Sequence, residues 1–519
     1  MKKPLALHPI LFAIFFVLAL YSYNVAEVSP SEIALPIAIV LGCTLLLLLL
    51  SWLLLKDAPK AGVAISIFVV LFFSYGYVAV GIENWGVTYK ALWPIWVLIV
   101  VLSMYLVIRT RRDLRKLTTI LNVIAITLVI IPTVNIAIQE TKAASLDTNP
   151  GGNVGTYVTD LEETDALPDI YYIDLDRYAS ESTLKEFYSY DNSEFLDYLS
   201  SKGFYIASES KANYLKTHLS LASSLNMKYV NYLSEIVGED SSDLDPFYEM
   251  LQDYEVWRFL KSKGYKYIHL GSWWEPTRKN EYADVNFNYW EVPQFSMTLF
   301  KTTMFYAIAL ENERLPNWLR APFIKEYRKA HWERILYQFD KLSEIPNMKE
   351  PTFVFAHLLV PHDPYIFDRE GNYLTLEDEK KRSRIVNYVD QLIFTNSKVK
   401  ALVDELLSNS EVPPIIILQS DEGPHPERYA LDETNFKWEE ATEAELREKM
   451  GILSAYYLPN VDNSVLYPSI TPVNSFRLVF NLYFDTNFEL LPDRVYAFHS
   501  NRYQYKLFDV TDKLKYDQQ

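Results

Sequence analysis

Long uncharged runs of apolar residues fill the first 140 positions, and the rest of the chain has the mixed pattern of a globular protein. Five of these runs have the length, roughly 20 apolar residues, that a helix needs to cross a bilayer. They lie near residues 5–23, 34–55, 61–81, 91–109 and 116–138. A buried core helix would explain any one run, but five in succession predict membrane spans. No cleavage pattern of small residues follows the first run, so we interpret it as a span and not as a signal peptide.

The basic residues of the connecting loops predict the orientation of these spans. Lysines or arginines precede the first span, follow the second and lie between the fourth and fifth, whereas loops 24–33 and 82–89 have none. Because basic loops stay on the cytoplasmic side, the N-terminus is expected inside and the C-terminal part outside. The spans lack deeply placed ionisable residues, which disfavours a transporter. We therefore expect a multi-pass protein of the cell (inner/plasma) membrane, with an anchor at 1–140, a linker at 141–167 and an extracytoplasmic domain at 168–519.

Short apolar runs alternate with helix-like stretches after residue 168, which is typical of an α/β sheet. Three of these runs are rich in β-forming residues: Asp169–Leu175, Thr352–Val360 and Pro414–Gln419. Nearly continuous apolar runs of this length suit strands of a buried parallel sheet. Each run ends just before a polar cluster. Ligands of α/β sheets bind beyond the carboxyl ends of the strands, so these clusters are candidate site residues.

Charge and cysteine content narrow the possible functions. The formal net charge is −17, which argues against a nucleic-acid partner because phosphate neutralisation requires basic surface. The single cysteine, Cys43, lies in an apolar run. The soluble part therefore contains no disulfide bond.

Acidic residues follow the first and third predicted strands. Asp176 follows the first, with Asp174 on the same face as its competitor, and Asp421 and Glu422 follow the third. Carboxylates at such positions are candidate ligands of a divalent cation. A helix cap or a solvated turn accounts equally well for each of them alone.

Thr217 begins a helical stretch in Lys211–Met227, where free backbone N–H groups would attract an anion. Its hydroxyl would be a nucleophile if a metal or a base activated it, and a helix N-cap is the competing interpretation. His362 follows the second strand and is a candidate contact for an anionic substrate or a metal, or else a turn residue. Arg177 and Arg428 flank acidic clusters as candidate anion clamps, although surface ion pairs would explain both.

Three further histidines are less defined. His357 lies inside the second strand, so we interpret it as a hydrogen-bonded core residue rather than as a ligand. His425 and His499 could each complete a site, and position alone favours neither.

Several segments resemble the membrane-anchored sulfatase-like proteins of the alkaline phosphatase superfamily: PDIYYIDLDRYAS, NYLKTHLSLASSLNM, HLLVPHDPY, IIILQSDEGPHP and the late stretch from ILSAYYLPN to TPVNSFRLVFN. That group includes lipoteichoic acid synthases and lipid A phosphoethanolamine transferases. The resemblance implies a five-helix transmembrane region followed by an alkaline phosphatase-like α/β/α domain with a mostly parallel central sheet. It also implies that Asp176 is the first-strand metal ligand, Thr217 the nucleophile of a T-x-x-S pattern, Asp421 the acid of the D-H-G motif and His362 the substrate-facing histidine.

Three departures from the family pattern limit the expected activity. The C/S-x-P-x-R motif of sulfatases is absent, which argues against formylglycine-dependent hydrolysis of sulfate esters. Glu422 stands where the D-H-G motif has histidine, so it adds a negative charge to the site. Arg177 stands where relatives usually have a small residue.

These features together predict a metal-dependent phospho- or sulfo-ester hydrolase or transferase that acts on a lipid or cell-envelope glycan at the outer membrane surface. The expected cofactor is one divalent ion (Mn, Mg, Ca or Zn). Its expected ligands are Asp176, Thr217, Asp421 and Glu422, with His362, Arg177 and Arg428 binding the substrate. The alternative is a non-catalytic envelope scaffold or glycan-binding protein on the same fold, and metal content would separate the two.

Overall fold

The computed structural model describes residues 5–25, 30–83, 89–146, 167–289, 294–306 and 327–514. The chain divides into two compact units. The first comprises Met1–Gly155 with Glu291–Lys325, and the second comprises Thr156–Trp290 with Glu326–Gln519.

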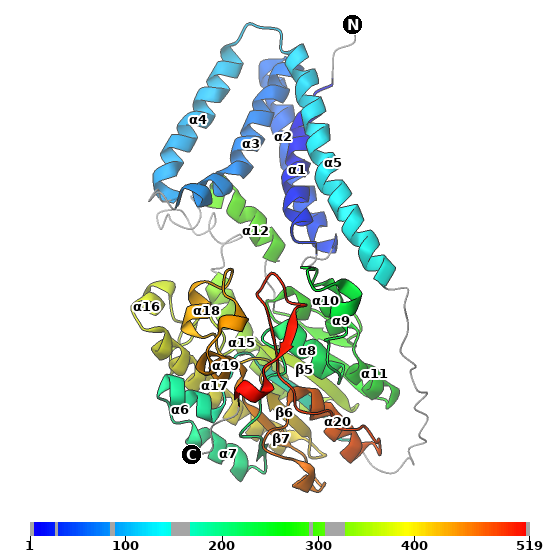
Figure 1. Ribbon diagram of the computed structural model, residues 1–519. Helices are drawn as coiled ribbons and strands as arrows, with labels where there is room; N and C mark the ends of the chain where they lie inside the picture. Colours follow the sequence, from blue (N-terminus) through cyan, green and yellow to red (C-terminus); the bar gives the residue numbers. More distant parts are fainter. Residues whose placement is uncertain are drawn as a thin grey trace. The chain divides into compact units, whose positions relative to one another are not determined.

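The first unit is built from apolar helices (Figure 1). They are α1 (His8–Ser22), α2 (Pro30–Leu55), α3 (Ala58–Glu83), α4 (Tyr89–Arg109) and α5 (Arg115–Leu146). Helices α2 to α5 are long and apolar enough to cross a membrane. Helix α1 has 15 residues, or about 22 Å at the helical rise, which is less than the ~30 Å of a hydrocarbon core. A membrane protein is therefore supported, whereas the number of spans and their orientation stay predictions.

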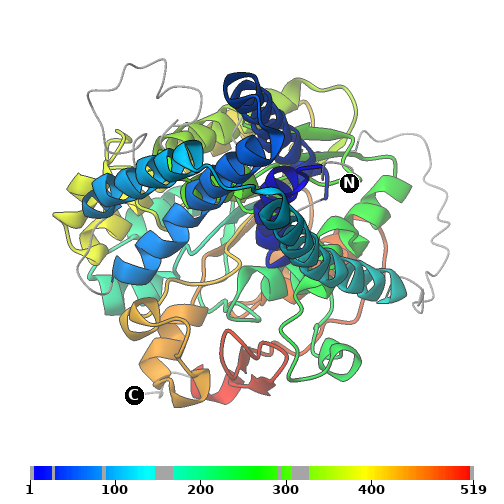
Figure 2. The ribbon, with the colours of Figure 1, turned by 90° about the horizontal axis from the view of Figure 1, so that it is seen from above.

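Helix α1 packs along α5 (Figure 1, Figure 2). The Asn122 side chain of α5 accepts hydrogen bonds from the backbone N–H groups of Leu7 and His8, at 3.0 and 2.9 Å. Free N–H groups at a helix start need such partners when water is excluded. One polar side chain on α5 thus stabilises the beginning of α1.

Helix α12 (Gln294–Thr302) also packs in the first unit, against α1, α2 and α3. Phe295 meets the Tyr21 ring edge-on at a centroid distance of 6.2 Å. A Cβ atom on Gly76 would lie 2.4 Å from the Lys301 carbonyl oxygen, so only glycine allows the backbone of α12 to approach α3 this closely. The sequence did not reveal this arrangement, because the segment is short and lacks a long apolar run.

The second unit contains a seven-stranded sheet in the order β2-β7-β6-β1-β5-β3-β4. Strands β1 (Ile170–Leu175), β5 (Thr352–Leu358) and β6 (Ile415–Gln419) form its parallel centre. Strands β3 (Lys266–Leu270) and β4 (Val285–Phe287) continue it in parallel. Strands β7 (Ser454–Tyr457) and β2 (Tyr205–Ile206) form an antiparallel edge. The predicted mostly parallel α/β sheet is confirmed.

Alternate residues of β1 enter two separate cores, because side chains along a strand point to opposite faces. Ile170 and Tyr172 pack in one core and Tyr171 and Ile173 in the other. Helices α8 (Thr217–Leu225), α10 (Asp245–Gln252), α11 (Glu255–Ser262) and α20 (Pro472–Tyr483) contribute to the first core. Helices α6 (Glu181–Tyr188), α7 (Ser193–Ser201), α15 (Tyr327–Glu344) and α17 (Arg384–Asn409) contribute to the second. Helices on both faces explain why the central strands are apolar throughout.

Smaller elements complete the second unit. They are α9 (Leu233–Val237), α16 (Leu376–Lys380), α18 (Glu427–Leu431), α19 (Glu443–Met450) and the hairpin of β8 (Tyr496–Phe498) with β9 (Leu507–Asp509). The carboxyl ends of β1, β5 and β6 meet at one edge of the sheet, because the three strands are parallel and adjacent. The candidate site lies at this edge.

Candidate active site and metal centre

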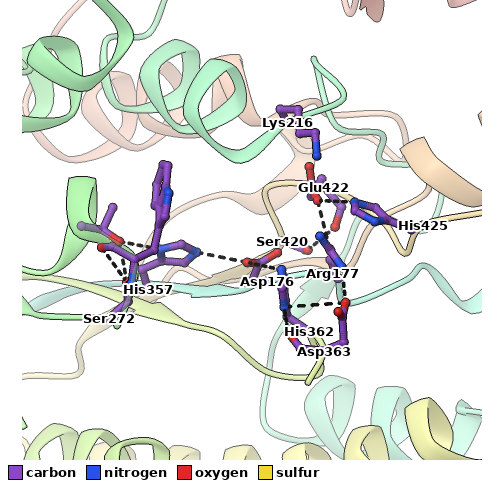
Figure 3. Close-up of polar contacts among 12 residues, drawn as sticks. Asp176, Arg177, Lys216, Ser272, His357, His362, Asp363, Ser420, Glu422 and His425 are labelled. Carbon is purple, nitrogen blue, oxygen red and sulfur yellow. Dashed lines mark hydrogen bonds and ion pairs between the residues drawn. The ribbon is translucent and has the colours of Figure 1, made fainter. Parts of the chain in front are cut away.

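Asp176, His357 and Asp421 converge at the carboxyl ends of the three central strands (Figure 3 labels the first two). One potential ligand atom from each lies within 4.8 Å of the other two, and all three side chains are buried. Such spacing lets one cation contact all three at normal bond lengths of about 2.0–2.6 Å. The acids that the sequence analysis placed at two strand ends are therefore brought together.

His357 is the member of this group that sequence reasoning assigned to the core. Its Nδ1 shares a hydrogen bond of 2.8 Å with the Thr277 hydroxyl, and its Nε2 faces Asp176 Oδ2 at 3.5 Å. A metal-binding histidine typically has its second ring nitrogen in a hydrogen bond, as Nδ1 is here. One signal in the sequence pointed to this role: His357 lies close to the carboxyl end of its strand, β5.

The acidic side chains of this edge repel one another in the absence of a cation. Burial, and next the charge of Asp176, raise the pKa values of Asp174 and Asp421 well above the usual range. Burial also acts to raise the pKa of Asp176, but the neighbouring His362 and His357 lower it overall. Among the described residues, Asp176 Oδ1 is buried without a hydrogen-bond partner. A divalent cation would remove both the repulsion and the missing contact, and mixed carboxylate and imidazole donors suit Zn²⁺ or Mn²⁺.

Thr217 is the first residue of α8, and Lys216 is the N-cap, with no side-chain capping bond. The N-cap interpretation of Thr217 is therefore wrong. The nearby Thr217 hydroxyl acts to lower the raised pKa of Asp421, whose two carboxylate oxygens are buried without a hydrogen-bond partner among the described residues. The threonine thus stands at the start of a helix and beside one potential metal ligand.

Glu422 is buried among cationic and imidazole groups (Figure 3). Its Oε1 lies 2.8 Å from Lys449 Nζ, 3.1 Å from Arg177 Nε and 3.4 Å from His425 Nε2. Burial acts to raise the pKa of Glu422, but Lys449 and its other two partners hold it well below the usual range. Its charge is therefore compensated by the protein, and His357, not Glu422, completes the group of potential ligands. Lys449 was not anticipated from the sequence.

Arg177 has a φ of 61°, in the left-handed region that disfavours residues with a Cβ atom. This conformation explains why a small residue suits the position. The guanidinium pairs with both Glu422 and Asp363, and the Arg177 carbonyl accepts a hydrogen bond of 2.8 Å from Tyr388. The Arg177 guanidinium thus pairs with acidic side chains of the site, and its role in substrate binding stays a prediction.

His362 faces the site, with Nε2 3.9 Å from Asp176 Oδ2. Its Nδ1 contacts the Asp363 carbonyl oxygen. Burial, and next the charge of Arg177, lower the pKa of His362. The Nε2 side of the ring faces Asp176. Trp273 packs edge-on against this ring at 6.5 Å.

Arg428 and His499 have partners on the surface. Arg428 is more than half exposed, pairs with Glu445 at 2.8 Å and lies over the Phe436 ring. His499 pairs with Glu439 at 2.9 Å. The structure does not bring either residue to the group around Asp176, so the surface interpretation of Arg428 fits better than an anion clamp.

A family model for the sulfatases matches residues 185–455, which is more than half of the 519 residues. The chain belongs to the sulfatase family. The resemblance read from the sequence is thereby confirmed, and the second unit is an enzyme domain of the alkaline phosphatase superfamily. The matched residues include Thr217, His357 and Asp421.

Solved structures show similar folds at low sequence identity. The C-terminal periplasmic domain of EcEptC from Escherichia coli, in complex with Zn, is 13% identical with a TM-score of 0.43, over 69% of this chain and 97% of that one. The integral membrane lipooligosaccharide phosphoethanolamine transferase A from Neisseria meningitidis is also 13% identical, with a TM-score of 0.38, over 91% of this chain and 95% of that one. None of the curated protein sequences matches this chain.

Proposed function

We propose that this sulfatase-family protein transfers or hydrolyses a phosphate or sulfate ester through Thr217, with one divalent cation, on a lipid or envelope glycan at the outer membrane surface. One observation carries the proposal: Thr217 lies at a helix start beside Asp421, which is itself within 4.8 Å of Asp176 and His357. The candidate nucleophile, the start of helix α8 and the group of potential metal ligands therefore support one active site.

Asp176, His357 and Asp421 would hold the cation, and the Thr217 hydroxyl is the candidate for a fourth contact. The cation would lower the pKa of a bound hydroxyl, orient the ester and neutralise charge on its oxygens. Glu422 is replaced by His357 in this ligand set, since its carboxylate is engaged by Lys449 and Arg177.

The residues of the chain supply the remaining roles. Thr217 Oγ1 would form the new bond to phosphorus or sulfur while the ester oxygen leaves with the bonding electrons. His362 would accept the hydroxyl proton of Thr217 and return it to the leaving oxygen. Water or an acceptor hydroxyl would then attack the covalent intermediate, and His362 would pass the proton of the attacking hydroxyl to the departing Thr217 oxygen. Lys216, next to Thr217, adds a positive charge near the incoming anion, although Glu433 lies 3.4 Å from its Nζ.

The direct test uses the full chain in detergent, with metal content and turnover of aryl phosphate and aryl sulfate measured on the same preparation. About one tightly bound divalent ion per chain, with metal-dependent turnover of one ester, is the expected result. A preparation that binds no divalent ion and turns over neither ester would favour the scaffold alternative.

The nature of the acceptor is a separate measurement. Release of free phosphate or sulfate that is unaffected by glycerol or by lipid hydroxyls would identify a hydrolase. Formation of a new ester with the added alcohol would identify a transferase.

A further inference from the structure

The side chain of Thr277 lies next to the His357 ring nitrogen that does not face the group of potential metal ligands. Thr277 ends the short helix η1 (Glu275–Thr277), and its Oγ1 lies 2.8 Å from His357 Nδ1. The other nitrogen, Nε2, faces Asp176 Oδ2 at 3.5 Å and has no hydrogen-bond partner among the described residues. Thr277 and His357 are both buried, so water does not replace the contact between them.

A second hydroxyl, that of Ser272, continues this contact (Figure 3 labels Ser272 and His357). Ser272 Oγ lies 2.8 Å from Thr277 Oγ1 and reaches the Trp274 carbonyl at 3.3 Å. It also accepts a hydrogen bond of 3.0 Å from the Trp274 N–H. A hydroxyl has one proton to donate, and a carbonyl can only accept. The chain of two hydroxyls therefore ends at a group that takes up a proton.

This chain has room for the form of His357 that a cation requires. A neutral imidazole carries one N–H, and the other nitrogen is the one that can bind a metal. When Nδ1 donates to Thr277, Thr277 donates to Ser272 and Ser272 donates to the Trp274 carbonyl, each of the three protons has an acceptor. The reverse order would place the ring proton on Nε2, where it would occupy the position of the cation.

The backbone of Thr277 is held in place by buried polar groups. Its carbonyl accepts hydrogen bonds from His269 Nε2 at 2.8 Å and from the Ser272 N–H at 3.1 Å. His269 Nδ1 in turn lies 3.0 Å from the Tyr267 hydroxyl, which accepts a hydrogen bond of 2.5 Å from Tyr254. His269 belongs to β3, the strand that pairs with the strand of His357. The hydroxyl of Thr277 is thus fixed relative to the imidazole that it contacts.

From these contacts we propose that Thr277 is a positioning residue of the metal centre. Its hydroxyl accepts the Nδ1–H of His357 and so keeps the Nε2 lone pair directed at the cation, which Thr277 itself would not touch. Gln338 donates to the His357 carbonyl at 3.2 Å, so the backbone of the histidine is held separately and Thr277 orients the ring. The inference rests on the proposed role of His357 as a metal ligand.

The test is the Zn²⁺ affinity of the full chain in detergent, measured by competition with a chromophoric chelator after the bound metal has been removed. Thr277→Val keeps the shape of the side chain but not the hydroxyl, and should weaken Zn²⁺ binding about 10–100-fold. Thr277→Ser keeps the hydroxyl and should bind Zn²⁺ nearly as tightly as the wild type. Thr352→Val is the matched control. Thr352 is buried at the opposite end of the strand of His357, and its hydroxyl donates to Asp169 at 2.8 Å.

A second measurement separates positioning from a general structural effect. In the His357→Ala background, Thr277→Val should cause no further loss of Zn²⁺ affinity, because no imidazole remains to be oriented. If Thr277→Val does not fold, Ser272→Ala replaces it in both backgrounds. This variant should weaken Zn²⁺ binding less, since the Thr277 hydroxyl remains, and again only when His357 is present.

The outcomes distinguish this inference from the proposed function. If His357→Ala weakens Zn²⁺ binding but Thr277→Val does not, the positioning role is wrong and the metal centre stands. The positioning role is also wrong if Thr277→Ser binds as weakly as Thr277→Val, if Thr352→Val causes an equal loss, or if the loss persists in the His357→Ala background. A wild-type protein that binds no Zn²⁺, or whose affinity does not depend on His357, would overturn the proposed ligand set and this inference together.

Discussion

The Nζ atom of Lys449 lies 2.8 Å from Oε1 of Glu422, and both side chains are buried. A buried ion pair loses hydration, so the two charges depend on each other. The pair places a carboxylate next to Asp421 without adding net charge to the edge of the sheet. Glu422 is thus compatible with an anionic substrate, despite the extra charge that its sequence position implies.

Removal of one partner should reveal this dependence. Lys449→Met is expected to destabilise the protein by up to about 3–5 kcal/mol, because Glu422 would be left partly uncompensated in the interior. The double variant Lys449→Met/Glu422→Gln should recover most of this loss. Urea unfolding followed by near-ultraviolet circular dichroism measures both, with exposed Lys437→Met as control. If Lys449→Met is as stable as Lys437→Met, the charge of Glu422 does not depend on Lys449.

Thr217 is predicted to be the nucleophile. Thr217→Ala should abolish turnover of the preferred aryl ester and leave the unfolding midpoint near that of the wild type, since Thr217 is not the N-cap of α8. Thr217→Ser should retain part of the rate because it keeps the hydroxyl. Mass spectrometry of acid-quenched protein should detect the covalent adduct in the wild type and not in the alanine variant. Wild-type turnover by Thr217→Ala would eliminate the nucleophile.

His357 is predicted to bind the metal ion. His357→Ala should lower the metal content at least tenfold from about one ion per chain when the concentration of free metal is limiting. The substitution removes one of the few side chains that bind the ion directly. His499→Ala, which alters a partly exposed histidine paired with Glu439, should keep full metal content. Elemental analysis of both variants provides the measurement. Equal metal content in His357→Ala and His499→Ala would show that His357 is a core residue, as its position in the strand suggested.

The sequence predicted the fold better than it predicted the details of the site. Parallel strands with apolar residues on both faces determined where Asp176 and Asp421 would meet. His357 was missed because a histidine inside a buried strand usually forms hydrogen bonds with its neighbours, and its proximity to Asp176 and Asp421 exists only in the folded chain. Lys449 and Glu422 are 27 positions apart and meet only in the folded chain. Helix α12 was missed because nine amphipathic residues do not identify the unit that they pack with.

Stability should fall in mild acid through His269. Its ring is buried between Tyr267 and the Thr277 carbonyl, and burial lowers its pKa from 6.5 to about 4. Below pH 6.5 the unfolded chain takes up a proton that the folded chain does not accept until about pH 4. The stabilising contribution is therefore complete above pH 6.5 and is lost as the pH falls toward 4, by up to about 3 kcal/mol. His269→Gln should reduce the slope of stability against pH in this window. An unchanged slope would show that other groups dominate.

Arg177 provides a test of backbone strain that is independent of catalysis. Arg177→Ala and Arg177→Gly both remove the ion pairs with Asp363 and Glu422, but only alanine keeps a Cβ atom at a φ of 61°. The left-handed conformation costs such a residue about 1–2 kcal/mol, and the greater freedom of glycine in the unfolded chain offsets about 0.4–1 kcal/mol of that difference.

The glycine variant should therefore be the more stable of the two, by roughly 0.5–1 kcal/mol. The same two substitutions at Arg428, which lies within helix α18, should give the opposite order, because glycine costs about 0.5–1 kcal/mol relative to alanine in a helix. Urea unfolding of the four variants measures both differences. The same sign at the two positions would mean that Arg177 does not hold the left-handed conformation in solution.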